Sequence, residues 1–209
     1  MTHTLHRLGR PDDLQDDYTI IFMSAGGYNN VGSQEKLRTF LRLAMKHHAV
    51  NFGNMEAGSA LFKDPEEIIE AVKDGTTVQA CFASETDYIN IVKELKNTNL
   101  GMSVIIGGLA DKVNKCCREA GVTPHTWNHS LGIWGKTELL PPRDVMELTT
   151  MCGHGMVAVS LVYDVMDKIK AGKMTYKEGA MRIAKPCICG LVNPVRAERI
   201  LKRLCEDKL

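Results

Sequence analysis

Hydrophobic residues follow two patterns in alternation along the first two thirds of the chain, one typical of strands and one typical of helices. Short runs of β-branched and aromatic residues, typical of strands, occupy residues 18–23, 49–52, 77–82 and 102–106, and residues 122–127 are a candidate fifth run. Apolar residues at helical spacing occupy 34–48, 65–74, 85–96 and 109–120. Glycine or a helix-start signal separates most of these segments, so we expect strands and helices in alternation.

This alternation predicts an α/β fold. Strands that are joined through helices typically lie side by side in one direction, so we expect a mostly parallel four- to five-stranded sheet flanked by helices. In such a sheet, ligands bind in the loops beyond the carboxyl ends of the strands. We therefore look for substrate-binding residues in those loops.

The pattern changes after Pro141 and Pro142, where only helical spacing continues. Helices are expected at about 155–171, at 175–184 and from 193 onward, with a cysteine-bearing turn at 186–192. We predict three parts: a polar N-terminal arm (1–17), an α/β sheet domain (18–140) and a C-terminal all-helical cap carrying the cysteine motifs (141–209).

Charge and hydropathy exclude several partners. The chain has 26 basic and 25 acidic residues, a balance that does not predict binding to nucleic acid or to an anionic membrane. The longest apolar run, 156–163, is far shorter than the roughly 20 residues of a spanning helix, and residues 1–17 do not resemble a secretory signal. As protein partners, a second copy of the chain and a redox or assembly partner stay open.

The cysteine content indicates the compartment. The chain has seven cysteines, an odd number, in 209 residues, whereas secreted disulfide scaffolds are smaller and evenly paired. We expect reduced thiols in a cytoplasmic protein. Closely spaced cysteines there are more typical of metal or redox chemistry than of packing.

The strongest local motif is Met151-Cys152-Gly153-His154-Gly155. With a helix expected from about residue 155, Cys152 falls at or just before its N-terminus, where free amides and the helix dipole stabilise a thiolate. We predict Cys152 as a base, nucleophile or metal ligand, with His154 as its catalytic neighbour. Gly153 and Gly155 leave room for backbone amides to hold an anionic substrate. The alternative is a buried cysteine that only fills a helix start.

Residues 151–158 (MCGHGMVA) resemble the MCGHG-type motif of the proline racemase family. The resemblance implies that Cys152 transfers a proton and that the amides of Gly153 to Gly155 hold the substrate carboxylate. It covers eight of the 209 residues, and Pro186-Cys187 and Cys189-Gly190 only partly match that family's second cysteine motif. We interpret it as a local similarity of the cysteine motif, not as a sign of common descent.

A second motif, Pro186-Cys187-Ile188-Cys189-Gly190, places two sulfurs on one turn. Together, Cys152, Cys187 and Cys189 predict a site for an iron–sulfur cluster or zinc, with His154, another histidine such as His129, or an open position in fourth place. A dithiol redox pair or inert packing would also account for this turn. Cys81 and Cys205 are interpreted as structural, and Arg196, Arg199, Lys202 and Arg203 as a solvated helix face.

Two loops are candidates for substrate binding. Gly26 and Gly27 follow the first strand, and their amides could hold an anion. His125, Trp127 and His129 combine polar and aromatic groups after the fourth helix of the sheet domain. We expect either loop to contact a small anionic substrate.

Three functions follow from these residues. The leading hypothesis is a metal or iron–sulfur protein that uses Cys152, Cys187 and Cys189 on a small anionic substrate, by redox or Lewis-acid chemistry. The second is a metal-free cysteine enzyme of the isomerase, racemase or transferase type. The third is a carrier or assembly factor for metal or sulfur, since exposed soft ligands exchange readily.

Overall fold

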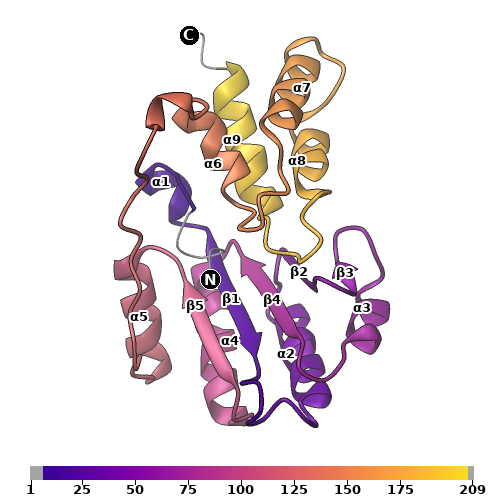
Figure 1. Cartoon of the computed structure of the whole chain (residues 1–209), viewed down its shortest axis with the longest axis vertical. Helices are drawn as coiled ribbons and strands as arrows, with labels where there is room; N and C mark the ends of the chain where they lie inside the picture. Colours follow the sequence, from indigo (N-terminus) through magenta and orange to yellow (C-terminus); the bar gives the residue numbers. More distant parts are fainter. Residues whose placement is uncertain (1–6, 207–209) are drawn as a thin grey trace.

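The structure of the chain, a computed structural model, describes residues 7–206 as a sheet-containing body with a helical cap stacked on one end (Figure 1). The strands are β1 (Tyr18–Met23), β2 (Asn51–Asn54), β3 (Gly58–Ser59), β4 (Thr77–Phe82) and β5 (Ser103–Gly107). The body helices are α2 (Gln34–Lys46), α3 (Pro65–Ala71), α4 (Glu85–Thr98) and α5 (Ala110–Ala120). The cap contains α6 (Arg143–Thr149), α7 (Val159–Lys170), α8 (Tyr176–Ala184) and α9 (Pro194–Glu206), with the short α1 (Pro11–Leu14) beside it.

The five strands form one sheet in the order β3-β2-β4-β1-β5, and every neighbouring pair is antiparallel. The prediction of a mostly parallel sheet is therefore wrong. Strands joined through a helix do run in the same direction, as expected. β1 and β2, joined through α2, are parallel in direction because both are antiparallel to β4. β4 and β5, joined through α4, share the opposite direction. Each pair is split by a strand of the other pair, as in split βαβ arrangements, so no parallel neighbours remain.

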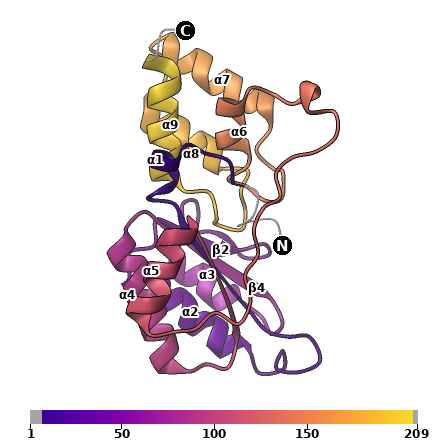
Figure 2. The same cartoon turned by 90° about the vertical axis from the view of Figure 1, so that its left-hand side faces the viewer.

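The fifth predicted strand, residues 122–127, is also wrong. This segment forms no strand, and the fifth strand is instead the two-residue β3, which pairs with β2. Residues 121–136 leave the end of α5 and run along the sheet toward the cap (Figure 2). Most side chains of this segment are exposed, so it has little to bury in a sheet.

Local capping explains several helix starts. The Asp64 carboxylate accepts hydrogen bonds from the Glu66 and Glu67 amides at the start of α3. Thr175 and Glu178 form a reciprocal capping box at the start of α8. These starts match the predicted ones because the signals are local in sequence.

The sheet has two buried faces with different partners. Ile20, Phe22 and Ala80 point to the face covered by α2 and α4, where Phe22 stacks on Phe40 with ring centroids 4.9 Å apart. Ile21 and Cys81 point to the opposite face and join the apolar core of the cap. Figure 2 shows the body helices on one side of the sheet only. Because successive side chains of β1 and β4 point to opposite faces of the sheet, these two strands contribute to the core of the body and to the core of the cap.

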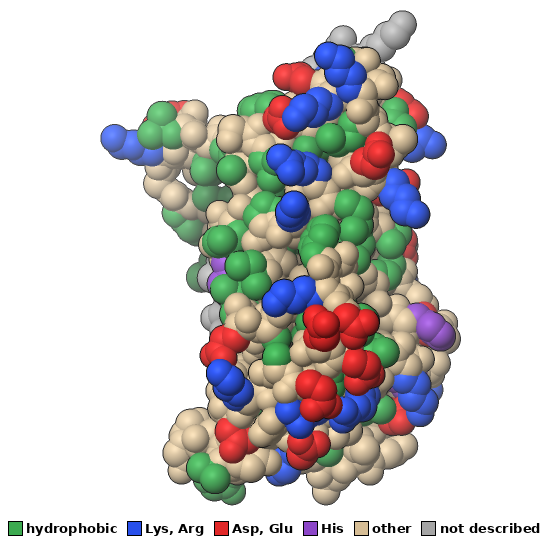
Figure 3. Space-filling view, turned by 90° about the vertical axis from the view of Figure 1, so that its right-hand side faces the viewer, with side chains coloured by type: hydrophobic (Ala, Val, Ile, Leu, Met, Phe, Trp, Pro, Cys, Tyr) green, Lys and Arg blue, Asp and Glu red, His purple; other side chains and the backbone are tan. Residues whose placement is uncertain are grey.

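The surface carries charges of both signs. Figure 3 shows acidic side chains gathered on the body and basic ones scattered over the cap. Across residues 7–206, no helix combines the length and apolar character that crossing a membrane requires.

Candidate functional site

The two cysteine motifs meet between the cap and the sheet. Cys152 lies in the turn that follows α6, and Cys187 and Cys189 lie in the turn between α8 and α9. Cys187 and Cys189 are fully buried, and Cys152 is 3% exposed. We call these three residues the cysteine cluster. Because α7 begins only at Val159, Cys152 is not at a helix N-terminus, and that prediction is wrong.

The sulfurs of the cysteine cluster contact one another in a chain. Cys187 Sγ lies 3.7 Å from Cys189 Sγ, and it also hydrogen-bonds the Cys152 thiol. The hydrogen bond with Cys187, followed by burial, raises the pKa of Cys152. The hydrogen bond from Cys187 lowers the pKa of Cys189. For Cys187, the bond to Cys152 lowers the pKa, but the bond to Cys189 and burial raise it further, to about 11.

Each sulfur of the cysteine cluster also accepts hydrogen bonds from the backbone. The amides of Met156 and His154 donate to Cys152, the Val192 amide donates to Cys187 and the Leu191 amide to Cys189. In the glycine-rich turn, the amides of His154 and Met156 thus point to the sulfur of Cys152 itself, whereas an anion held by the amides of Gly153 to Gly155 stays a prediction. Such bonds favour the thiolate over the thiol.

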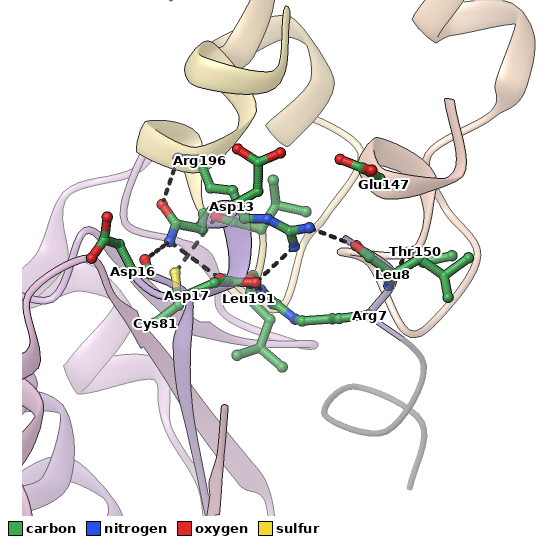
Figure 4. A network of polar contacts seen from close by, with 12 residues as sticks. Arg7, Leu8, Asp13, Asp16, Asp17, Cys81, Glu147, Thr150, Leu191 and Arg196 are labelled. Carbon is green, nitrogen blue, oxygen red and sulfur yellow. Dashed lines mark hydrogen bonds and ion pairs between the residues drawn. The ribbon is translucent and has the colours of Figure 1, made fainter. Parts of the chain in front are cut away.

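A buried ion pair lies beside the cysteine cluster. Arg7 donates to both Asp17 oxygens at 2.6 and 2.7 Å and to the Leu191 carbonyl, and Arg196 donates to Asp17 at 2.8 Å (Figure 4). Arg196 and the Asp17 carboxylate are fully buried, so the prediction that Arg196 belongs to a solvated face is wrong. The positive charge of Arg7 acts on Cys187 and Cys189. Sequence reasoning missed this pair, because nothing local links residues 7 and 17 to residue 196.

A groove of about 1000 Å³ runs along β5 beside residues 122–130. We call it the β5 groove. His125, Trp127 and His129 line it, and the Trp127 and His129 rings stack with centroids 6.2 Å apart. Arg7, Asp17 and Thr19 also line it, at the end of β1 nearest the cap. The groove is linked to the cysteine cluster through Arg7, but none of the three cysteines lines it.

The remaining predicted site residues are placed separately. Gly26 and Gly27 follow β1 at the end of the sheet away from the cap, and the Gly27 amide donates to the Asn30 side chain at 2.8 Å. The structure does not bring them to the cysteines. Gly153 and Gly155 lie in the Cys152 turn with His154, whose side chain is exposed.

The cysteine sulfurs do not face one common centre. Within residues 7–206, no three or more His, Cys, Asp or Glu side chains converge in a way that would hold a metal ion. The thiols are instead linked pairwise, from Cys152 to Cys187 to Cys189. Binding a metal here would require the thiols to lose their protons and the side chains to rotate.

Comparison of the chain with protein-family models, with curated proteins and with solved structures found no match in any of the three.

Proposed function

We propose that Cys152, Cys187 and Cys189 bind an iron–sulfur cluster or a zinc ion, and that this centre acts on a small anionic substrate by redox or Lewis-acid chemistry. The observation that carries the proposal is the meeting of three buried sulfurs from two motifs more than thirty positions apart in the chain. Thiolates are the ligands that these centres prefer.

The backbone around the sulfurs supports this proposal. Amide hydrogen bonds to ligating sulfurs stabilise the thiolate and tune a bound centre. All three cysteines receive such bonds, and the Arg7 guanidinium adds positive charge nearby. Inert packing requires neither feature, because a thiol in an apolar core is satisfied without a charge beside it.

The sulfur spacing is compatible with coordination. A zinc–sulfur bond of about 2.3 Å in a tetrahedral site places neighbouring sulfurs roughly 3.8 Å apart. Cys187 and Cys189 are already 3.7 Å apart. The adjustment that the site needs therefore falls mainly on Cys152, whose turn contains two glycines.

The β5 groove is the proposed substrate site. It is large enough for a small molecule, and it combines the His125, Trp127 and His129 side chains with the region around Arg7. An anionic compound bound at the Arg7 end of the groove would lie beside the guanidinium whose charge acts on Cys187 and Cys189. This shared arginine is the reason to propose a reactive rather than a purely structural centre.

The test is elemental analysis and visible absorption of the anaerobically purified full chain. We expect stoichiometric iron with sulfide, or zinc, in the wild type, and its loss in Cys187→Ser and Cys189→Ser. Cys116→Ser is the matched control, because Cys116 is fully buried on α5 outside the cluster. A wild type that holds no metal, and takes up neither zinc nor iron and sulfide on reconstitution, overturns the proposal.

A metal-free dithiol function is the second candidate, favoured by the 3.7 Å contact between Cys187 and Cys189. In it, the Cys189 thiolate attacks a small-molecule disulfide, and Cys187 then displaces the second thiol. The pair is oxidised to one disulfide while the reagent is reduced to two thiols. Titration with oxidised dithiothreitol should link these two cysteines in wild type and in Cys152→Ser, but not in Cys187→Ser.

A Cys152-based enzyme and a metal or sulfur carrier are less favoured. The raised pKa of the Cys152 thiol disfavours the thiolate that a base or nucleophile needs, whereas the pKa of Cys189, the attacking sulfur of the dithiol candidate, is lowered. A carrier that hands on metal or sulfur needs exposed soft ligands, whereas Cys187 and Cys189 are fully buried.

A further inference from the structure

The outer edge of β5 has no strand partner. Within residues 7–206, the sheet order ends at β5, which pairs with β1 alone, and no backbone hydrogen bond joins β5 to residues 121–136. In an antiparallel pair, every second residue of a strand points its amide and carbonyl away from the partner strand. β5 therefore presents backbone donors and acceptors on its outer side, an edge that proteins usually cover or protect.

The β5 groove opens on this edge. All five residues of β5 line the groove, although successive side chains of a strand point to opposite faces of the sheet. A groove that is lined from both faces includes the edge between them. Residues 122–130 line its outer side. A single extended chain fits between this segment and β5, whereas the edge of another folded sheet does not.

The walls of the groove offer contacts to the side chains of a bound strand. Leu95 of α4 and Val113 of α5 line it from the helix layer, and Trp127 and His129 line it from the outer segment. Because the side chains of an extended ligand alternate in direction, they would contact both of these walls. The lining thus suits a chain with apolar side chains.

The cap end of the groove is positively charged. Arg7 and Asp17 line this end, and both Arg7 and Arg196 donate to Asp17. Since two guanidinium groups share one carboxylate, these three buried side chains together carry a net charge of +1. Glu147, whose charge also acts on Arg196, is paired with Arg203. A ligand carboxylate at this end would meet a complementary charge.

We infer that the β5 groove binds a short peptide with a free C-terminal carboxylate, which adds to β5 as an extended strand. Main-chain hydrogen bonds to the open edge hold the peptide, and its carboxylate lies at the Arg7 end. β5 ends at Gly107, opposite Thr19 at the cap end of β1, so the peptide runs parallel to β5. Five residues at about 3.3 Å each span about 17 Å, which a peptide of about five residues covers.

This inference names the substrate class of the proposed function and rests on it for the peptide's role as substrate. Binding itself does not require the metal centre. The experiment is therefore a binding measurement on the full chain as purified, with the metal content of the same sample determined separately. The probe is a fluorescein-labelled peptide of five alternating valine and threonine residues with a free C-terminus, followed by fluorescence polarisation.

Three changes to the probe test the geometry without altering the protein. The C-terminal amide should bind about tenfold more weakly than the free acid, because it loses a hydrogen bond to a charged group. Two isomers carry the same number of N-methyl groups, at the second and fourth or at the third and fifth residues, and block opposite edges of the peptide. One isomer should bind about tenfold more weakly than the parent and the other should match it, because only alternate amides face β5.

A pair of protein variants locates the site. Val104 of β5 lines the groove and is 38% exposed, so Val104→Arg should fill the groove and abolish binding of the peptide. Val31→Arg is the matched control, because Val31 is 86% exposed and lies outside the groove. Far-UV circular dichroism confirms that both variants are folded. Equal affinities of Val104→Arg and wild type would place the peptide elsewhere and overturn the inference.

The remaining outcomes separate this inference from the proposed function. If both N-methylated isomers match the parent, or wild type does not bind the peptide, strand addition fails while the metal content still decides the proposed centre. If one isomer alone loses affinity on a protein that takes up no metal, the groove binds a peptide but the centre fails. A dimer in sedimentation velocity that Val104→Arg makes monomeric would assign the β5 edge to a second copy and overturn the inference.

Discussion

Gly190 lies directly against the backbone of Phe52, so that a side chain at Gly190 would overlap the Phe52 carbonyl group. Gly190 also has a φ of +81°, in the region that favours glycine. Together with the hydrogen bond from the Asn51 side chain to the Val192 carbonyl, this contact seats the cysteine turn of the cap on β2 of the sheet. Both the fold and the geometry of the cysteine turn therefore depend on Gly190.

Substitution of this glycine should destabilise the protein strongly. Gly190→Ala adds backbone strain and a clash with main-chain atoms that cannot rotate away, together about 3 kcal/mol. Urea denaturation measures the loss in the free energy of unfolding. Gly155→Ala is the control: φ is +68° but nothing lies within 4 Å, so only the strain of about 1 kcal/mol remains. Equal losses in the two variants would contradict the packing argument.

The buried Asp17 carboxylate should be essential for stability. It pairs with two guanidinium groups, and its removal in Asp17→Ala leaves Arg7 and Arg196 buried without their partner. Breaking a buried pair in this way costs about 3–5 kcal/mol. Asp164→Ala breaks an exposed pair with Lys168 and should cost under about 0.5 kcal/mol. A thermal or urea melt of Asp17→Ala that matches wild type would rule out this role.

Asp17 also makes stability depend on pH. Burial alone would raise the pKa of Asp17, but Arg7 and then Arg196 lower it further than burial raises it, so the folded-state pKa lies below the ordinary value. The ionised carboxylate therefore stabilises the fold above about pH 4, the unfolded-state pKa, and this contribution is lost as the pH falls through the folded-state pKa. The unfolding free energy of Asp17→Asn should decline less steeply than that of wild type below about pH 4. Parallel curves would show that another group controls acid unfolding.

The sequence predicts individual elements better than their arrangement. Strands 18–23 and 77–82 are found with the predicted bounds, because β-branched runs and local breakers define them. The sheet order was not predictable in the same way, since a helix between two strands fixes their relative direction but not whether another strand inserts between them. The insertion of β4 between β1 and β2 is determined by tertiary packing, which the local spacing of hydrophobic residues does not encode.

The candidate site shows the same division. Two short motifs pointed to Cys152, Cys187 and Cys189, and the structure brings their sulfurs together. Arg7 and Cys81 reach the same region from parts of the chain with no motif. Their positions there depend on long-range contacts, so only the folded arrangement reveals them.

The β5 groove makes a prediction that can be read by fluorescence. The chain has two tryptophans: Trp127 lines the groove, whereas Trp134 is 82% exposed and does not. In Trp134→Phe, the remaining indole should change its emission on titration with a panel of small mono- and dicarboxylates, because a bound ligand displaces water from the ring.

The reciprocal variant Trp127→Phe keeps only the tryptophan outside the groove and should not respond to the same ligand. His129→Ala removes the ring that stacks on Trp127 and should weaken binding several-fold, since aromatic contacts of this kind contribute about 0.5–1.5 kcal/mol. If the Trp127→Phe protein responds as strongly as Trp134→Phe, the carboxylate binds elsewhere and the β5 groove is not its site. A response confined to Trp134→Phe locates the ligand beside residues 122–130. Arg7 lines the same groove. The proposed substrate must lie at that end of the groove for the cysteine centre to act on it.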